Sequence, residues 1–177
     1  MFLKKIKNKL KVRAARKYLR QELAAPSNVP NKGVGVSSIG FIVDLDKFNN
    51  ADSFYTVIEE FSLRPNAIKV IGYKEFYDKN SPYSTPVFSD KDLGWDAKIE
   101  NSYALEFLEN EYDVLVNYYN EDKLLLQLMS IKAKARLKVG FGGVDKNFND
   151  LILNIPIDDF QTFKMELKKY LRVLNEI

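Results

Sequence analysis

Apolar residues change from a strand-like run to a helical spacing and back within residues 112–141. Residues 114–116 are continuously apolar, as in a strand that is covered on both faces, and residues 137–141 form a similar run. Between the two runs, apolar residues recur at the spacing of an α-helix: Leu124, Leu125, Leu128 and Met129. Two strands joined through a helix make a parallel crossover. This stretch therefore predicts an α/β fold.

The preceding sequence repeats this alternation of apolar strands and helical segments. It predicts three strands, at residues 39–45, 68–73 and 85–88. A helix is expected over residues 51–63, with Asn49 or Asn50 as its N-cap, and another over residues 102–110. These elements predict a Rossmann-like three-layer sandwich whose mostly parallel sheet has the strand order 3-2-1-4-5-6.

The last strand is expected at residues 151–157, where Pro156 suits an edge position. Only nine residues separate it from the strand that ends at Phe141. Parallel strands usually need about a dozen residues to cross over, so the sequence predicts that this edge strand is antiparallel. A final helix, capped by Asp158 and Asp159, is expected to bury a stripe of apolar residues: Phe160, Phe163, Leu167, Leu171 and Leu174.

Composition excludes much of the usual site chemistry. The chain has 177 residues, enough for one compact domain, and it contains no cysteine and no histidine. Disulfides, thiolate or imidazole metal sites and nucleophiles activated by histidine are therefore absent. Catalysis would have to use carboxylates, lysine, tyrosine or a hard cation such as Mg²⁺. We expect no cofactor and no catalytic residue, and the absence of cysteine fits a reducing cytoplasm.

Positive charge is concentrated at the beginning of the chain. Residues 1–25 carry nine basic side chains against Glu22 alone, a net charge of +8, whereas the remaining 152 residues have a net charge of −5. The nine cations are candidate surface-binding residues: Lys4, Lys5, Lys7, Lys9, Lys11, Arg13, Arg16, Lys17 and Arg20.

These cations surround one apolar stripe in a predicted amphipathic helix: Phe2, Leu3, Ile6, Leu10, Ala14, Tyr18 and Leu19. Pro and Gly make residues 26–37 a predicted linker before a single α/β domain at residues 38–177. We expect few contacts between helix and body, and the helix to be dispensable for folding.

Three interpretations of the basic helix stay open. It packs on the body with its charges solvated, it lies on an anionic membrane surface, or it binds RNA or a protein partner. No apolar run follows the charges as in a secretory signal, and none is long enough to span a bilayer. A cytoplasmic location is expected, peripheral at the inner membrane if the helix contacts lipid.

Topology points to a second candidate site. In open α/β sheets ligands bind beyond the carboxyl ends of the strands, where the strand order reverses. This switch point lies between the strands that end near Leu45 and Asn117. The candidate crevice comprises Asp46, Asn117, Tyr119 and Glu121, with further polar neighbours at Lys47, Asn49, Asn50, Asn120 and Asp122. Asp46 and Glu121 are equally typical of turns and of the first turn of a helix.

Other residues are weaker candidates. Gly140-Phe-Gly-Gly lacks the following helix and the Lys-Ser/Thr pair of a phosphate loop, which favours turn glycines. Trp95, Tyr118 and Tyr119 could stack on a base or a sugar, although aromatic residues after an apolar strand usually belong to the core.

Two resemblances accompany these patterns. Tyr112-Asp-Val-Leu-Val, followed by Lys134-Ala-Arg-Leu-Lys-Val-Gly-Phe, resembles the N-terminal half-domain of heptosyltransferase-type glycosyltransferases. That resemblance implies a Rossmann-like fold and carries no catalytic residue, because Asp46-Lys-Phe-Asn-Asn-Ala-Asp lacks the Leu-Gly-Asp segment usual in the first loop of those enzymes.

The second resemblance extends over nearly the whole chain. It is carried by Ile39-Gly-Phe-Ile-Val-Asp-Leu-Asp-Lys-Phe, Lys91-Asp-Leu-Gly-Trp, Val116-Asn-Tyr-Tyr-Asn-Glu-Asp, Asn149-Asp-Leu-Ile-Leu and Leu167-Lys-Lys-Tyr-Leu-Arg-Val-Leu-Asn. With the basic N-terminal helix, these segments are similar to a family of small uncharacterised proteins from Bacteroidota. This resemblance implies a single domain and no assigned activity.

Three functions are consistent with the sequence. The favoured one is a non-catalytic domain that binds a protein partner or an anionic membrane through its basic helix. The second is a nucleotide- or sugar-nucleotide-binding protein or enzyme that uses the acidic crevice. The third is RNA association through the basic segment. Removing residues 1–25 separates the second function from the others, because only the crevice survives the deletion.

Overall fold

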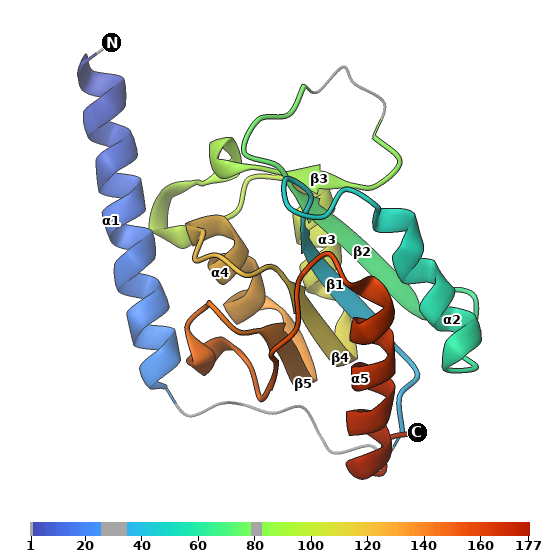
Figure 1. Ribbon diagram of the computed structural model, residues 1–177. Coiled ribbons are helices and arrows are strands. Elements are labelled where there is room, and N and C mark those ends of the chain that lie inside the picture. The colour runs from blue at the N-terminus through green and yellow to red at the C-terminus, as the bar shows by residue number, and fades with distance from the viewer. Residues whose placement is uncertain (1, 26–34, 79–82) are drawn as a thin grey trace.

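A six-stranded sheet forms the centre of the molecule. The computed structural model describes residues 2–25, 35–78 and 83–177 (Figure 1). The strands are β1 (Ile39–Asp44), β2 (Ile68–Tyr73), β3 (Val87–Phe88), β4 (Glu111–Tyr118), β5 (Lys134–Phe141) and β6 (Leu151–Leu153). They lie in the order β3-β2-β1-β4-β5-β6, so the predicted α/β class and strand order are confirmed.

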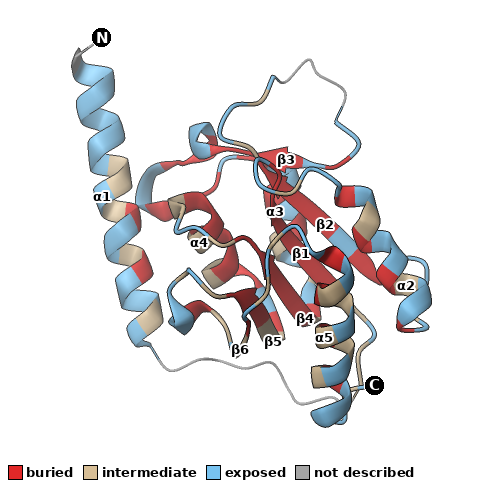
Figure 2. Cartoon of the chain, viewed as in Figure 1, coloured by how far each residue is buried: buried red, intermediate tan, exposed pale blue. Residues whose placement is uncertain are grey.

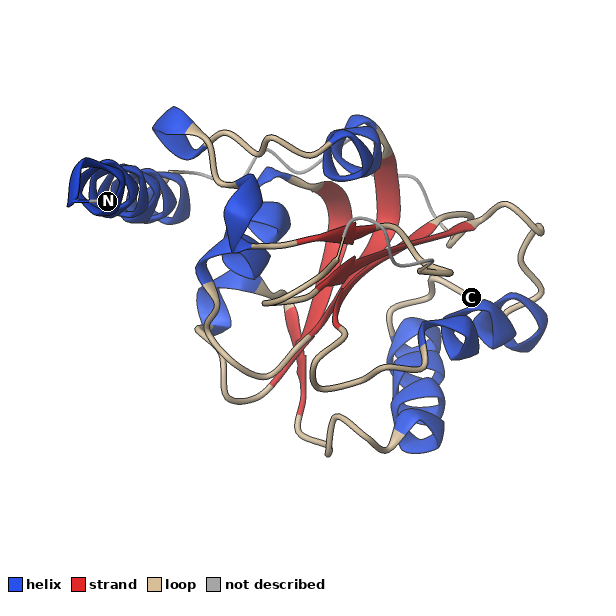
Figure 3. Cartoon of the chain, turned by 90° about the horizontal axis from the view of Figure 1, so that it is seen from above, coloured by secondary structure: helices blue, strands red, loops and turns tan. Residues whose placement is uncertain are grey.

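Helices cover both faces of the sheet. The α-helices are α1 (Phe2–Ala24), α2 (Val57–Glu60), α3 (Ser102–Glu109), α4 (Leu124–Lys132) and α5 (Phe160–Val173). Short 3-10 helices are η1 (Ala51–Thr56), η2 (Asp90–Asp92), η3 (Trp95–Ala97) and η4 (Lys146–Phe148). Viewed from above, α3 and α4 lie on one side of the sheet and α2 and α5 on the other, and α1 forms an outer layer beyond α4 (Figure 3).

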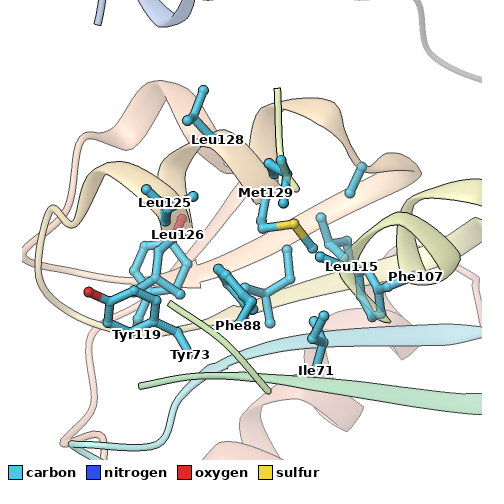
Figure 4. Packing of buried hydrophobic residues seen from close by; sticks show 14 of the residues in the cluster. Ile71, Tyr73, Phe88, Phe107, Leu115, Tyr119, Leu125, Leu126, Leu128 and Met129 are labelled. Atoms are coloured by element: carbon cyan, nitrogen blue, oxygen red, sulfur yellow. The ribbon is translucent and has the colours of Figure 1, made fainter. Parts of the chain in front are cut away.

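Alternate residues of each central strand face two separate cores. On the side of α4, Leu115 packs with Ile71, Phe88, Phe107 and Met129 (Figure 4). On the other side, the neighbouring Val114 and Val116 belong to a cluster with residues of η1 and α5. Because both faces are buried, the central strands are continuously apolar, as the sequence pattern indicated.

The core on the α5 side is rich in aromatic rings. The ring centroids of Phe41 and Phe54 lie 4.5 Å apart, and those of Tyr118 and Phe163 lie 5.0 Å apart. The hydroxyl of Tyr118 donates to the carbonyl of Ile157 at 2.7 Å, so this buried tyrosine is a satisfied core residue.

The direction of the last strand differs from the prediction. β6 is parallel to β5, and Leu151 pairs with Val139. Because β6 has only three residues and pairs with the end of β5, the chain must return by about three residues rather than by a full strand. Nine residues that include η4 suffice for this short return, so the expectation of an antiparallel strand at residues 151–157 was wrong.

The segment at residues 51–63 is less helical than predicted. It consists of η1 followed by one turn of α2, and Asn50 makes no side-chain capping hydrogen bond. The hydroxyls of Ser53 and Thr56 instead donate to carbonyls three residues earlier, at 2.6 and 2.7 Å. Such bonds compete with α-helical pairing, and the β-branched residues at 56–58 also lower helix propensity.

The ends of the other elements follow local chemistry. The Asn101 side chain accepts from Ala104 N at 3.0 Å and caps α3, and the Asp159 side chain accepts from Thr162 N at 3.0 Å and caps α5 as predicted. β3 begins only at Val87 because Pro86 has no amide hydrogen to donate. Leu174, expected in the buried stripe of α5, lies at the C-cap and is exposed.

Most of the predicted linker, residues 26–34, lies outside the described residues. After it the chain is held by an ionic clasp, which we define as Arg136, Asp113 and Glu176. The guanidinium of Arg136 donates to Gly35 O at 2.7 Å and pairs with both carboxylates, and Val36 N donates to Glu176 O at 3.0 Å. The clasp fixes the chain where it enters β1.

Candidate functional site

The C-terminal half of α1, residues 11–24, packs on the body. Ala15 is fully buried, Leu19 is nearly so, and both belong to the core on the α4 side. Figure 2 shows that the buried positions of α1 begin midway along the helix and face the body. The expectation that few contacts join this helix to the body was therefore wrong for its C-terminal half.

The N-terminal half of α1, residues 2–10, projects beyond the carboxyl edge of the sheet (Figure 1). Its apolar side chains are solvent-accessible: Leu3 is 71% exposed, Ile6 39% and Leu10 50%. At about 100° per residue, these three lie roughly half a turn from Ala15 and Leu19. The predicted single stripe is therefore two apolar faces, one docked and one pointing away from the body.

The cations of α1 have no acidic partners in the described part of the chain. Of the nine candidate residues, eight are exposed and Lys11 is half-buried. Lys11 Nζ donates to Leu93 O at 3.0 Å, and none of the nine forms an ion pair with a carboxylate that the structure places. The outer surface of α1 is thus strongly positive.

The docked half contributes one further contact with a cation. Lys132 of α4 lies 4.2 Å from the ring centroid of Tyr18, close enough for a cation–π interaction. Burial lowers the pKa of Lys132, while nearby Glu22 opposes that shift. This contact holds the end of α4 against the helix.

The predicted crevice at the switch point is bridged by ion pairs. Lys47 Nζ after β1 lies 2.6 Å from Glu121 Oε1 after β4. Asp46 Oδ1 is 3.8 Å from Lys74 Nζ, and Asp46 Oδ2 accepts from Glu75 N at 2.8 Å. The structure brings Asp46 and Glu121 to the same edge, and each is engaged by a lysine. The hydrogen bond from Lys47 lowers the pKa of Glu121.

A buried ion pair that sequence reasoning missed lies beneath this edge. Asp44, at the end of β1, is fully buried, and its Oδ2 is 2.7 Å from Lys123 Nζ. Lys123 also lies 5.0 Å from the ring centroid of Tyr73. An acidic residue inside the apolar run at residues 39–45 was the available signal, because a buried carboxylate requires a partner.

Asn117 and Tyr119, the other crevice candidates, are fully buried on the α4 side. Asn117 Nδ2 donates to Ser130 Oγ at 2.7 Å and to Asn149 Oδ1 at 2.8 Å. The Asn149 side chain occupies the space where a Cβ at Gly140 would stand. Burial raises the pKa of Tyr119 well above its usual value. Asn117, Ser130 and Asn149 thus form a polar network inside the domain, and Tyr119 is buried on the same side, so neither candidate lines an open crevice.

Within residues 2–25, 35–78 and 83–177, acidic side chains form no cluster of three or more suited to a metal ion. No helix in the same ranges is both long and apolar enough to cross a bilayer.

These features define a class of protein: an α/β domain with an all-parallel six-stranded sheet and a basic helix docked by one half. The chain belongs to the family described as "Family of unknown function (DUF6913)", whose model matches residues 11–174. No curated protein and no solved structure matches the chain. Membership of a family without an assigned activity agrees with the sequence-based expectation, and these findings give no support to the resemblance to heptosyltransferases.

Proposed function

We propose that this protein is a non-catalytic α/β domain that attaches to an anionic membrane surface through the outward face of α1. The observation that carries the proposal is the reversal of apolar faces along the helix. Leu3, Ile6 and Leu10 point away from the body, whereas Ala15 and Leu19 point into it. A helix that only stabilised the domain would need no exposed apolar face in its first three turns.

The outward face has the chemistry of a lipid-binding helix. Beyond Leu10 the same side of the helix continues with Arg13, Lys17 and Arg20, all exposed. Apolar side chains bury into the boundary between headgroups and acyl chains, while each cation near an anionic surface contributes about 1 kcal/mol. Because the docked face is on the opposite side, the body does not block this surface.

We propose peripheral attachment, at the cytoplasmic face of a membrane, where anionic lipids attract basic helices. In the described part of the N-terminal half of α1, three accessible apolar side chains project beside a larger number of cations, so the interaction depends on charge as well as on apolar burial. Salt should weaken it steeply as the Debye length falls from about 10 Å at 0.1 M to about 3 Å at 1 M.

Vesicle sedimentation tests the proposal. The full chain should bind vesicles that contain anionic lipid at low salt, release at high salt, and bind neutral vesicles weakly. Replacing Leu3 and Ile6 by Gln keeps the charge and should weaken partitioning about tenfold or more, because full burial of one such side chain contributes about 1.5 to 3 kcal/mol.

Matched controls are available on α5. Met165 and Val173 are 63% and 71% exposed, so Met165→Gln with Val173→Gln removes comparable apolar surface on the opposite side of the molecule. This control should bind like the unmodified chain. Equal binding to neutral and anionic vesicles would reject the electrostatic mechanism, and binding to RNA alone would favour the nucleic-acid interpretation.

A further inference from the structure

A groove separates the N-terminal half of α1 from the segment that contains η2 and η3. Its volume is about 630 Å³, and it lies on the flank of α1 rather than on the outward apolar face. Four of its eight lining residues are lysines, Lys4, Lys7, Lys11 and Lys91, and the others are Asn8, Asp90, Leu93 and Trp95. Sites for small molecules typically occupy about 300 to 1,000 Å³, so the groove is of a suitable size.

Lysines stand on both walls of this groove. Lys4, Lys7 and Lys11 are three or four residues apart and therefore share one face of α1, while Lys91 comes from the opposite segment. Asp90 is the one acidic residue among the lining side chains. Like charges at this spacing repel one another, so a bound anion would stabilise the groove.

Trp95 gives the groove an accessible aromatic wall. It is the only tryptophan of the chain and is 46% exposed, although sequence reasoning favoured a core position. Lys11 Nζ lies 5.8 Å from its ring centroid. The next two residues, Asp96 and Ala97, have positive φ angles of 53° and 58°, and Ala97 is fully buried. The chain thus turns Ala97 inward beside α1 and leaves the indole outside.

We propose that this groove binds a small soluble polyphosphate. Four ammonium groups around one cavity match a compact ligand with several negative charges, and lysine binds phosphate as a point charge. A ligand with a single carboxylate would engage only part of this charge. The site is separate from the membrane-binding face, because Leu3, Ile6 and Leu10 do not line it.

Titration with inorganic tripolyphosphate at about 0.15 M salt tests the groove, since screening at this ionic strength suppresses attraction beyond about 8 Å. Trp95 emission and calorimetry on the full chain give two independent readouts. Both should saturate at one ligand per chain. Lys4→Gln with Lys7→Gln should weaken binding at least about tenfold, and Lys91→Gln should weaken it from the opposite wall.

The matched control is Lys5→Gln with Lys9→Gln, which removes the same charge from the same turns of α1 outside the groove. It should change the affinity less than about twofold. Equal weakening by both double variants would show diffuse attraction and overturn the proposal, as would the absence of saturable heat.

Vesicles provide the remaining arm of the experiment. A Trp95 response to anionic vesicles but not to tripolyphosphate would assign the groove to lipid headgroups and reject a soluble ligand. Leu3→Gln with Ile6→Gln changes the membrane-binding face and not the groove, so it should leave tripolyphosphate affinity unchanged, and the two proposals fail separately.

Discussion

The two halves of α1 have similar basic composition and opposite relations to the domain. Residues 11–24 bury Ala15 and Leu19 against the body, whereas residues 2–10 project and expose Leu3 and Leu10. The family match begins at residue 11, where the docked half begins. Charge density alone therefore does not show which part of a basic helix belongs to a fold. The face of the helix on which its apolar residues lie does show which part belongs to the fold.

Helix physics explains why one half depends on the other. A segment of nine residues is too short to be a stable helix in water, because nucleation costs more than a few hydrogen bonds return. Packing of residues 11–24 supplies the nucleus from which residues 2–10 extend. The projecting half can therefore remain exposed while it has helical geometry.

The largest expected effect concerns the buried ion pair beneath the docked half. Val12 and Arg16 of α1 and Lys123 line one cavity of about 380 Å³. Lys123→Met should leave the fully buried Asp44 without its partner and destabilise the domain by about 3 to 5 kcal/mol, measured by urea denaturation. Lys47→Met removes half of an exposed pair and should leave the denaturation midpoint unchanged. Equal effects of both variants would contradict the assigned burial.

A smaller effect compares the two halves directly. Leu19→Ala should destabilise the domain by about 2 to 4 kcal/mol, because it removes methyl groups from a packed core. Leu10→Ala, in the projecting half, should change stability by less than about 0.5 kcal/mol. Chemical denaturation of both variants checks the comparison, and a large loss for Leu10→Ala would mean that the projecting half is also packed.

The ionic clasp predicts that the stability of the domain depends on pH through Glu176. The cations of α1 predict no such dependence, because none of them pairs with a carboxylate in the described part of the chain. The hydrogen bond from Arg136 holds the pKa of Glu176 below its usual value of 4.5. A lowered folded-state pKa adds stability that is present above about pH 4.5 and lost as pH falls through the folded value. Glu176→Gln should therefore lower the free energy of unfolding by about 1 kcal/mol at pH 7. It should have no effect at a pH low enough to protonate Glu176 in both the folded and the unfolded state. A cost that persists at low pH would indicate lost packing instead.

The smallest expected effect is on the thermal midpoint after deletion of residues 2–10. It should move by less than about 2 °C, because in a domain of this size 1 kcal/mol corresponds to about 2 to 4 °C. Deletion through residue 25 removes Ala15 and Leu19 and should lower the midpoint by several times more. Equal midpoints for both deletions would show that the docked half adds nothing to stability.

The sequence predicted the structure well where the periodicity of apolar residues alone determines the type of element. Continuous apolar runs predicted the central strands, because burial on both faces leaves no polar alternation, and the strand order followed from the parallel crossovers. The sequence was less informative where the outcome depended on the length of a strand or on the face of a helix that its apolar residues occupy. The three-residue β6 could return in a short parallel link, and the apolar residues of α1 change faces near residue 11.

The candidate site was predictable only in part. Asp46 and Glu121 lie at the predicted edge of the sheet. The lysines that pair with them come from other segments, and a single sequence does not show which distant segments form ion pairs. Asn117 and Tyr119 alternate with residues of the other core, so the direction of each side chain depended on the register of β4. Trp95 is exposed and is followed by two residues with positive φ angles, neither of which a sequence pattern indicated.

Amide hydrogen exchange along α1, with and without anionic vesicles, tests the central claim most directly. Without vesicles, residues 11–24 should be protected nearly as well as the core, whereas residues 2–10 should exchange within the fastest class of amides. Adding vesicles should protect residues 2–10 and leave the sheet unchanged. Equal protection of both halves in the absence of vesicles, or no new protection in their presence, would contradict the division of α1 into a docked half and a membrane-binding half.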